Sequence, residues 1–226
     1  MDFECHGISN YKVLRKAITL WEQKYNKKVV QFTMRYKKMY RYCYDTGVCV
    51  EFENGHKAFF QHYEEPFSRL FFGNIALRKS CYNCQFKTVM RNSDITMGDS
   101  WFSELQTGKT GMDSCGVSKI IAQSRKGEQL LDGSTYIEKY PVNIDELLKV
   151  NGNMMTMSAV DKPGKRDYFF EHLETDEFKN LVNKCSANVN KSKFIKLLKR
   201  LIVNTKWFSK YRKKQNQKQY LGRLMK

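Results

Sequence analysis

The sequence contains no long apolar run and has little proline or glycine. No segment approaches the roughly 20 consecutive apolar residues of a membrane-spanning helix. The opening residues Met1–Glu4 lack the basic flank and the apolar stretch of a signal peptide. Only 3 prolines and 13 glycines occur among 226 residues, 41% of which are hydrophobic, so the chain is neither collagen-like nor disordered. We therefore expect a folded, cytoplasmic protein.

The sequence also lacks the common motifs of hydrolytic and phosphate-binding enzymes. It has no glycine-rich phosphate loop and no G-x-S-x-G nucleophile elbow. The four histidines, at positions 6, 56, 62 and 172, do not show the i, i+4 spacing that binds a metal ion on one helix face. Hydrolytic catalysis therefore has no support in the sequence.

Acidic residues are missing from residues 178–226, which hold 15 of the 40 lysines and arginines. Residues 1–177 have 25 basic and 23 acidic side chains, so they contribute only +2 to the formal net charge of +17. The basic charge therefore belongs to a C-terminal segment and not to the body of the protein. We expect one domain over residues 1–184 and a basic, helical tail over residues 185–226.

The tail combines this charge with an apolar helical face over residues 191–226. The apolar face consists of Phe194, Ile195, Leu197, Leu198, Leu201 and Ile202, and the aromatic residues Trp207, Phe208 and Tyr211 follow it. Such a helix suits the inner face of an anionic membrane, where aromatic rings lie at headgroup depth and cations meet lipid. It equally suits packing against the domain. Nucleic acid is a third partner for so basic a segment, although the body shows no recognised nucleic-acid-binding module.

Hydrophobic periodicity predicts an α/β (α+β) fold with a mixed β-sheet and flanking helices. Apolar residues spaced three and four apart predict a helix over residues 10–25, capped by Ser9. Further helices are expected from Pro66 to near Gly73 and over 126–131, 144–150 and about 164–183. Strands are expected over 30–34, 40–44, 48–52, 56–61, 117–123 and 135–140, with a type I′ turn at Asn54-Gly55 and a mobile loop over 103–116.

Seven cysteines include a single C-x-x-C pair, Cys81 and Cys84. Two thiolates at this spacing can bind one metal ion or cluster from a single turn. A structural zinc site usually needs a second pair, and Cys43 and Cys49, which flank a predicted turn, are more simply explained as buried hydrophobic residues. An iron–sulfur cluster, a zinc ion and an unliganded pair all remain open for Cys81 and Cys84.

Two further segments carry candidate site residues. Cys5 stands at the end of a predicted first strand, so it is either an exposed strand-end cysteine or a ligand. Residues 94–99 are predicted to form a short strand that runs into a turn at Gly98, where the missing Cβ would let the backbone approach a phosphate or a flavin. An ordinary turn explains the same residues.

Five motifs, in order, carry a resemblance to a known family. They are Phe3–Ser9, Phe52–Gly55, Leu77–Lys87, Ser93–Trp101 and Gly116–Ser118. Over about residues 1–175 the sequence resembles the C-terminal domain of the coenzyme F420 hydrogenase/dehydrogenase beta-subunit family. The motifs together are far more specific than any one of them.

The resemblance implies an oxidoreductase that transfers electrons through an iron–sulfur cluster (4Fe-4S) and FAD. It implies that Cys5, Cys81 and Cys84 are cluster ligands and that Asp94, Ile95, Gly98 and Asp99 lie beside the flavin. A fourth ligand is not assigned, and Cys115 is a candidate within this chain.

Members of the family usually also carry, upstream, a ferredoxin-like module that this sequence lacks. We therefore expect this domain to depend on a redox partner protein or on such a module. The alternative, of a different class, is a non-catalytic membrane or nucleic-acid adaptor. It would use the basic tail and keep the Cys81/Cys84 pair for structural zinc or without a ligand.

Overall fold

The computed structural model describes residues 1–36, 47–109, 117–156, 164–186 and 206–225. The chain divides into two compact units, each assembled from segments that are far apart in sequence. The first unit contains Met1–His6, Cys84–Ser158 and Leu201–Lys226, and the second contains Gly7–Asn83 and Ala159–Arg200. The predicted strand 40–44 and the cysteines Cys43 and Cys115 lie outside the described residues.

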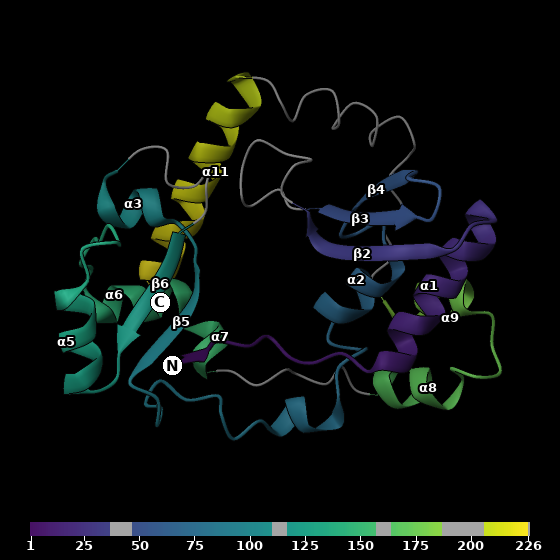
Figure 1. Cartoon of the computed structure of the whole chain (residues 1–226), viewed down its shortest axis with the longest axis horizontal. Coiled ribbons are helices and arrows are strands. Elements are labelled where there is room, and N and C mark those ends of the chain that lie inside the picture. Colours follow the sequence, from purple (N-terminus) through teal and green to yellow (C-terminus); the bar gives the residue numbers. More distant parts are fainter. Residues whose placement is uncertain (37–46, 110–116, 157–163, 187–205, 226) are drawn as a thin grey trace. The chain divides into compact units, whose positions relative to one another are not determined.

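A three-stranded sheet forms the centre of the first unit (Figure 1). Its strands are β1 (Asp2–Phe3), β5 (Ile95–Ser100) and β6 (Val117–Ala122), in the order β1-β5-β6. Strand β1 runs parallel to β5, whereas β5 and β6 are antiparallel, so the sheet is mixed as the sequence predicts. Strand β5 continues through Gly98, which pairs with Lys119, and the turn expected at this glycine is therefore wrong.

Short helices surround this sheet. They are α3 (Ser103–Thr107), α5 (Arg125–Gly133), α6 (Ile144–Asn151) and α7 (Asn153–Thr156). The Asn143 side chain accepts hydrogen bonds from the first turn of α6 and so caps the helix expected over 144–150. Helix α3 corrects the loop expected over its residues. The strand expected over 135–140 is also wrong, because this exposed segment has no regular structure.

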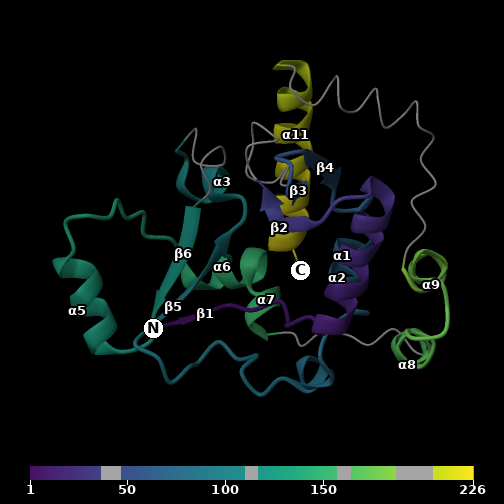
Figure 2. The ribbon, with the colours of Figure 1, turned by 45° about the vertical axis from the view of Figure 1, so that its right-hand side comes forward.

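The C-terminal helix α11 (Lys206–Leu224) runs against α6 (Figures 1 and 2). Arg223 donates a hydrogen bond to the carbonyl oxygen of Val150 at 2.6 Å, and the Tyr220 hydroxyl donates to the Glu146 carboxylate. Burial and this carboxylate raise the pKa of Tyr220 to about 12, so the phenol keeps its proton. This end of the predicted tail therefore packs on the first unit.

The second unit contains an antiparallel sheet of β2 (Val29–Tyr36), β3 (Gly47–Phe52) and β4 (Lys57–Gln61). Between β3 and β4 the Gly55 N–H donates to the Phe52 carbonyl oxygen, and only Gly55 of the two turn residues has a positive φ, 78°. A type I′ turn needs positive φ at both positions, so the predicted turn type is wrong. The geometry is instead a type I turn followed by a left-handed glycine.

Helices cover this second sheet and form the larger core. They are α1 (Tyr11–Tyr25), α2 (Pro66–Phe72), the 3-10 helix Lys79–Asn83, α8 (Lys165–Glu171) and α9 (Phe178–Cys185). Buried residues from α1, α2, α8 and α9 form one apolar cluster, and Trp21 with Phe52 and the β3 valines forms another. Asn10, not Ser9, caps α1, because its side chain accepts from the Lys12 N–H. The single helical region expected over 164–183 is divided into α8 and α9.

The α/β class is thus confirmed, with two small sheets. Among the described residues, no helix has both the length and the apolar character needed to cross a membrane.

The buried carboxylate of Glu65 yields a stability prediction. It accepts hydrogen bonds from Trp21 Nε1 at 3.3 Å and from the backbone of Phe67 and Ser68 at 3.0 and 2.6 Å. Glu65→Ala should lower the free energy of unfolding by about 2–4 kcal/mol, because three buried donors lose their acceptor. Urea denaturation measures the change. Glu171→Ala, at an exposed position of α8, should change it by less than about 0.5 kcal/mol; equal effects of the two substitutions would contradict this account.

Candidate redox site

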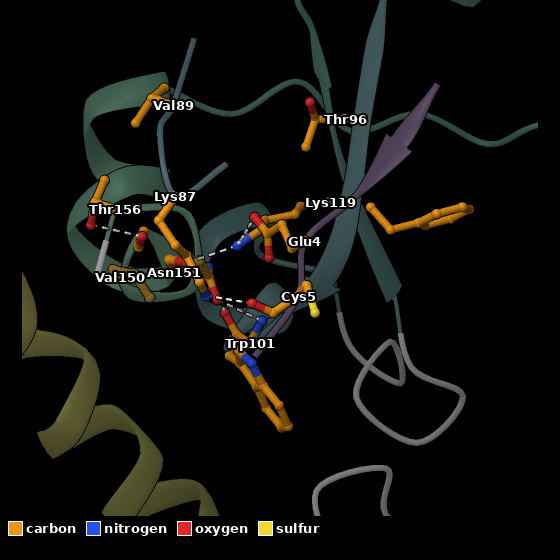
Figure 3. Close-up of polar contacts among 12 residues, drawn as sticks. Glu4, Cys5, Lys87, Val89, Thr96, Trp101, Lys119, Val150, Asn151 and Thr156 are labelled. Carbon is orange, nitrogen blue, oxygen red and sulfur yellow. Dashed lines mark hydrogen bonds and ion pairs between the residues drawn. The ribbon is translucent and has the colours of Figure 1, made fainter. Parts of the chain in front are cut away.

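A buried ion pair stands directly after β1. The Glu4 N–H continues the β1–β5 pairing by donating to the Met97 carbonyl oxygen at 2.8 Å. Alternation along the strand turns the Glu4 side chain inward, where its Oε1 atom lies 2.7 Å from Lys119 Nζ (Figure 3). The two side chains are 1% and 4% exposed, so the pair is held out of water.

The Lys119 ammonium also connects the sheet to helix α6. It donates to the Asn151 carbonyl oxygen at 2.7 Å. The Asn151 amide in turn holds the backbone of Trp101, accepting from its N–H at 2.8 Å and donating to its carbonyl at 3.1 Å (Figure 3). One buried cation therefore joins the segment after β1, strand β6 and the end of α6.

Gly98 makes room for the Glu4 carboxylate. A Cβ at this position would lie 2.2 Å from Glu4 Oε2, which no real contact allows. Oε2 accepts no hydrogen bond among the described residues. Burial raises the pKa of Glu4 against the opposing effect of Lys119, and burial lowers the pKa of Lys119 against the opposing effect of Glu4.

Cys5 follows Glu4 and is exposed, as the sequence predicts for a strand-end cysteine. The Lys87 ammonium donates a hydrogen bond to the Cys5 carbonyl oxygen (Figure 3). Burial lowers the pKa of Lys87, and the Cys5 and Cys84 thiols act in the opposite direction. Lys87 therefore lies close to both thiols.

In the second unit, Cys81 is held by the segment that follows Cys5 in the chain. The Asn10 N–H donates to the Ala76 carbonyl oxygen at 2.7 Å, and the Arg78 N–H donates to the Ile8 carbonyl oxygen at 2.8 Å. This pairing directs the Ile8 N–H at Cys81 Sγ, 3.2 Å away. Two motifs separated by about 70 residues are thus aligned within one unit.

Tyr82 and Arg166 fix the turn that carries Cys81. The Tyr82 hydroxyl donates to the Asn74 carbonyl oxygen. The Arg166 guanidinium lies 5.2 Å from the centre of the Tyr82 ring and donates to the Leu77 carbonyl oxygen at 3.3 Å. Tyr82 lies between Cys81 and Cys84 within the Leu77–Lys87 motif, although it was not predicted as a site residue. Arg166 was missed because it is more than 80 residues away and no motif marks it.

The candidate ligands are distributed over both units. Cys5 and Cys84 belong to the first unit and Cys81 to the second. Among the described residues, no group of three or more His, Cys, Asp or Glu side chains is arranged to hold a metal ion. The ligand set therefore stays a prediction. Cys49 is buried, as expected for a cysteine that only packs.

The residues expected beside a flavin take part in packing within the first unit. Asp94 Oδ1 accepts from the Ser124 hydroxyl at 2.6 Å, and this hydroxyl caps α5. Ile95 is buried, and Glu4 fills the space over Gly98. Asp99 pairs with Ser118 in the β5–β6 ladder. The Glu4 carboxylate thus occupies the space over Gly98, and these four positions remain a prediction.

Sequence comparison identifies the family to which these segments belong. Residues 1–144 match the family model for the C terminus of the beta subunit of coenzyme F420 hydrogenase/dehydrogenase. The chain belongs to this family. No curated protein matches the chain. The match covers the buried ion pair, Cys5, Cys81, Cys84 and strand β5, and it assigns the chain to a family of redox enzyme subunits.

Two residues of this site were missed because their sequence signals are weak. The signal for Lys119 is that it is the only charged residue of the largely apolar strand β6, a position where a buried cation is one explanation. Asn151 ends α6, where an asparagine usually indicates only a helix terminus.

The ion pair predicts a pH-dependent variant. Lys119→Met leaves the Glu4 carboxylate buried without its cation and should lower the free energy of unfolding by about 3–5 kcal/mol at neutral pH. The folded-state pKa of Glu4, which is already above the ordinary value of 4.5, then rises further because the cation that opposed this rise is gone. A carboxyl group whose pKa is higher in the folded state contributes stability at pH values below its unfolded-state pKa. This contribution is lost as the pH rises through its folded-state pKa.

Urea denaturation should therefore show that Lys119→Met regains stability as the pH falls from neutrality toward 4.5. The double variant Glu4→Met/Lys119→Met removes both charges and should recover most of the stability, with little dependence on pH. A single variant as stable as the unsubstituted protein at neutral pH would contradict the interpretation.

Proposed function

We propose that this chain is an electron-transfer domain of an oxidoreductase, with a 4Fe-4S cluster bound by the thiolates of Cys5, Cys81 and Cys84. The observation that carries the proposal is the hydrogen bond from the Ile8 N–H to Cys81 Sγ in a chain of this redox family. Backbone N–H groups directed at ligand sulfurs are one of the means by which proteins set a cluster potential.

The surroundings of the other two thiols support the same chemistry. Lys87 lies near Cys5 and Cys84, where its ammonium group could offset part of the negative charge of a thiolate-bound cluster. Cys5 stands two residues before Gly7, and the segment from Gly7 to Asn10 is hydrogen bonded to the segment that leads into Cys81. A Cβ on Gly7 would lie 2.8 Å from the Leu77 side chain, so glycine allows this close approach.

The proposal includes FAD and a redox partner. A bound cluster exchanges single electrons, and a flavin converts them into two-electron hydride chemistry. Asp94, Ile95, Gly98 and Asp99 are the positions proposed beside the flavin. The Glu4 carboxylate fills the space over Gly98. The partner is a redox protein or a ferredoxin-like module, and the proposed location is the cytoplasm, where thiols stay reduced.

The competing function is a non-catalytic adaptor in which Cys81 and Cys84 bind zinc or nothing. It differs from the proposal in the metal that the protein binds and in the number of cysteines it requires. A pair alone would not need Cys5.

Anaerobic reconstitution with iron and sulfide tests the proposal. Cys5→Ala, Cys81→Ala and Cys84→Ala should each abolish or strongly reduce the visible cluster absorption, because each removes a ligand. Cys49→Ala is the matched control, since it removes a buried cysteine from outside the set, and it should keep the absorption. Retention of the full absorption by the Cys5→Ala variant would remove Cys5 from the ligand set, and stoichiometric zinc without iron would favour the adaptor.

A further inference from the structure

Helix α11 presents two opposite faces. The inward face is fixed by three residues at helical spacing, Lys213, Tyr220 and Arg223. Lys213 forms an ion pair with Glu104 at 3.5 Å, and the Arg223 guanidinium lies 5.2 Å from the centre of the Phe102 ring. With the Tyr220 contact to α6, these interactions determine which side of α11 faces the solvent.

The outward face is a stripe of exposed residues. They are Tyr211, Lys214, Lys218, Leu221 and Met225, spaced three, four, three and four apart. This spacing places them on one face of a helix. Tyr211 and Leu221 are each 48% exposed and Met225 is 82% exposed. The stripe therefore presents apolar side chains and cations together to the solvent.

The chemistry of this stripe matches an anionic lipid surface. No acidic residue occurs anywhere in α11, so no negative charge on the helix repels an anionic partner. Exposed Leu, Met and Tyr side chains can enter the boundary between headgroups and acyl chains while the lysines meet the headgroups. We propose that the outward face of α11 binds the surface of membranes that contain anionic lipids.

This inference is independent of the proposed redox chemistry. Nucleic acid would also attract the lysines, but it gives no role to the exposed Leu221 and Met225 side chains. The contacts of α11 with α3 and α6 residues keep the stripe on the surface of the first unit, so binding requires no unfolding of this helix end.

Vesicle co-sedimentation of the full chain tests the inference. Binding is expected to vesicles of phosphatidylcholine with phosphatidylserine, to weaken at high salt, and to be much lower on phosphatidylcholine alone. Lys214→Gln/Lys218→Gln should reduce the partition coefficient about 30-fold, which corresponds to about 1 kcal/mol for each lysine. Lys214→Glu/Lys218→Glu should reduce it further.

The matched control carries the same charge change elsewhere. Lys12→Glu/Lys179→Glu replaces exposed lysines in the first turns of α1 and α9, where acidic residues are well tolerated. This variant should bind at least tenfold better than Lys214→Glu/Lys218→Glu. Circular dichroism and urea denaturation verify that each variant folds.

Equal loss in the two charge-reversed variants would overturn the inference, because net charge rather than the stripe would then be responsible. An intact protein that stays in the supernatant with anionic vesicles at low salt would also overturn it. If such a protein instead retards an oligonucleotide, and Lys214→Glu/Lys218→Glu abolishes the retardation, nucleic acid is the partner of α11.

Discussion

The first unit depends on one buried ammonium group, that of Lys119. It meets the carboxylate of Glu4 from the segment after β1 and the carbonyl oxygen of Asn151 at the end of α6. A buried charge with one acceptor removed is costly, so these three segments must stay together for the unit to remain folded. The same contact fixes side-chain direction, because Glu4 points inward and its neighbour Cys5 is therefore directed outward. Helix α6, held at Asn151, also carries the Glu146 and Val150 contacts of α11.

Hydrogen bonds hold the backbone that carries two of the candidate thiols. Cys5 is exposed, yet its carbonyl oxygen is bonded to Lys87 and the preceding residue is buried in the ion pair. In the second unit, Cys81 is held by the Ile8 N–H, and Arg166 packs over the neighbouring Tyr82 ring. Cys5 is exposed and Cys81 is half-buried, and both stand on backbone that hydrogen bonds hold in place. Such thiols suit metal binding, which also requires a path by which the metal enters.

The sequence predicted what depends on local patterns. Helix α6 follows its asparagine cap, and α2 begins at Pro66, as expected from residues that act within one turn. Errors arose where tertiary contacts decide. Gly98 was expected in a turn, but the carboxylate of Glu4, more than 90 residues away in sequence, explains why a glycine is needed inside a strand. The apolar pattern of residues 135–140 matched a strand, yet no neighbouring strand pairs with it among the described residues, and a strand requires a partner.

The candidate site was predictable as a set of cysteines and a family resemblance, which the match over residues 1–144 confirms at the level of the family. The supporting residues Lys87, Lys119 and Arg166 could not be found in this way, because lysine and arginine are common on every surface and only their burial and partners distinguish them.

The most direct test of the proposed redox function is the electron paramagnetic resonance spectrum of the anaerobically reconstituted, dithionite-reduced chain, with iron and sulfide measured on the same sample. The account predicts about four iron and four sulfide per chain and the paramagnetic signal of a reduced 4Fe-4S cluster. Protein that retains zinc, or no metal, and shows no such signal after reduction would contradict it.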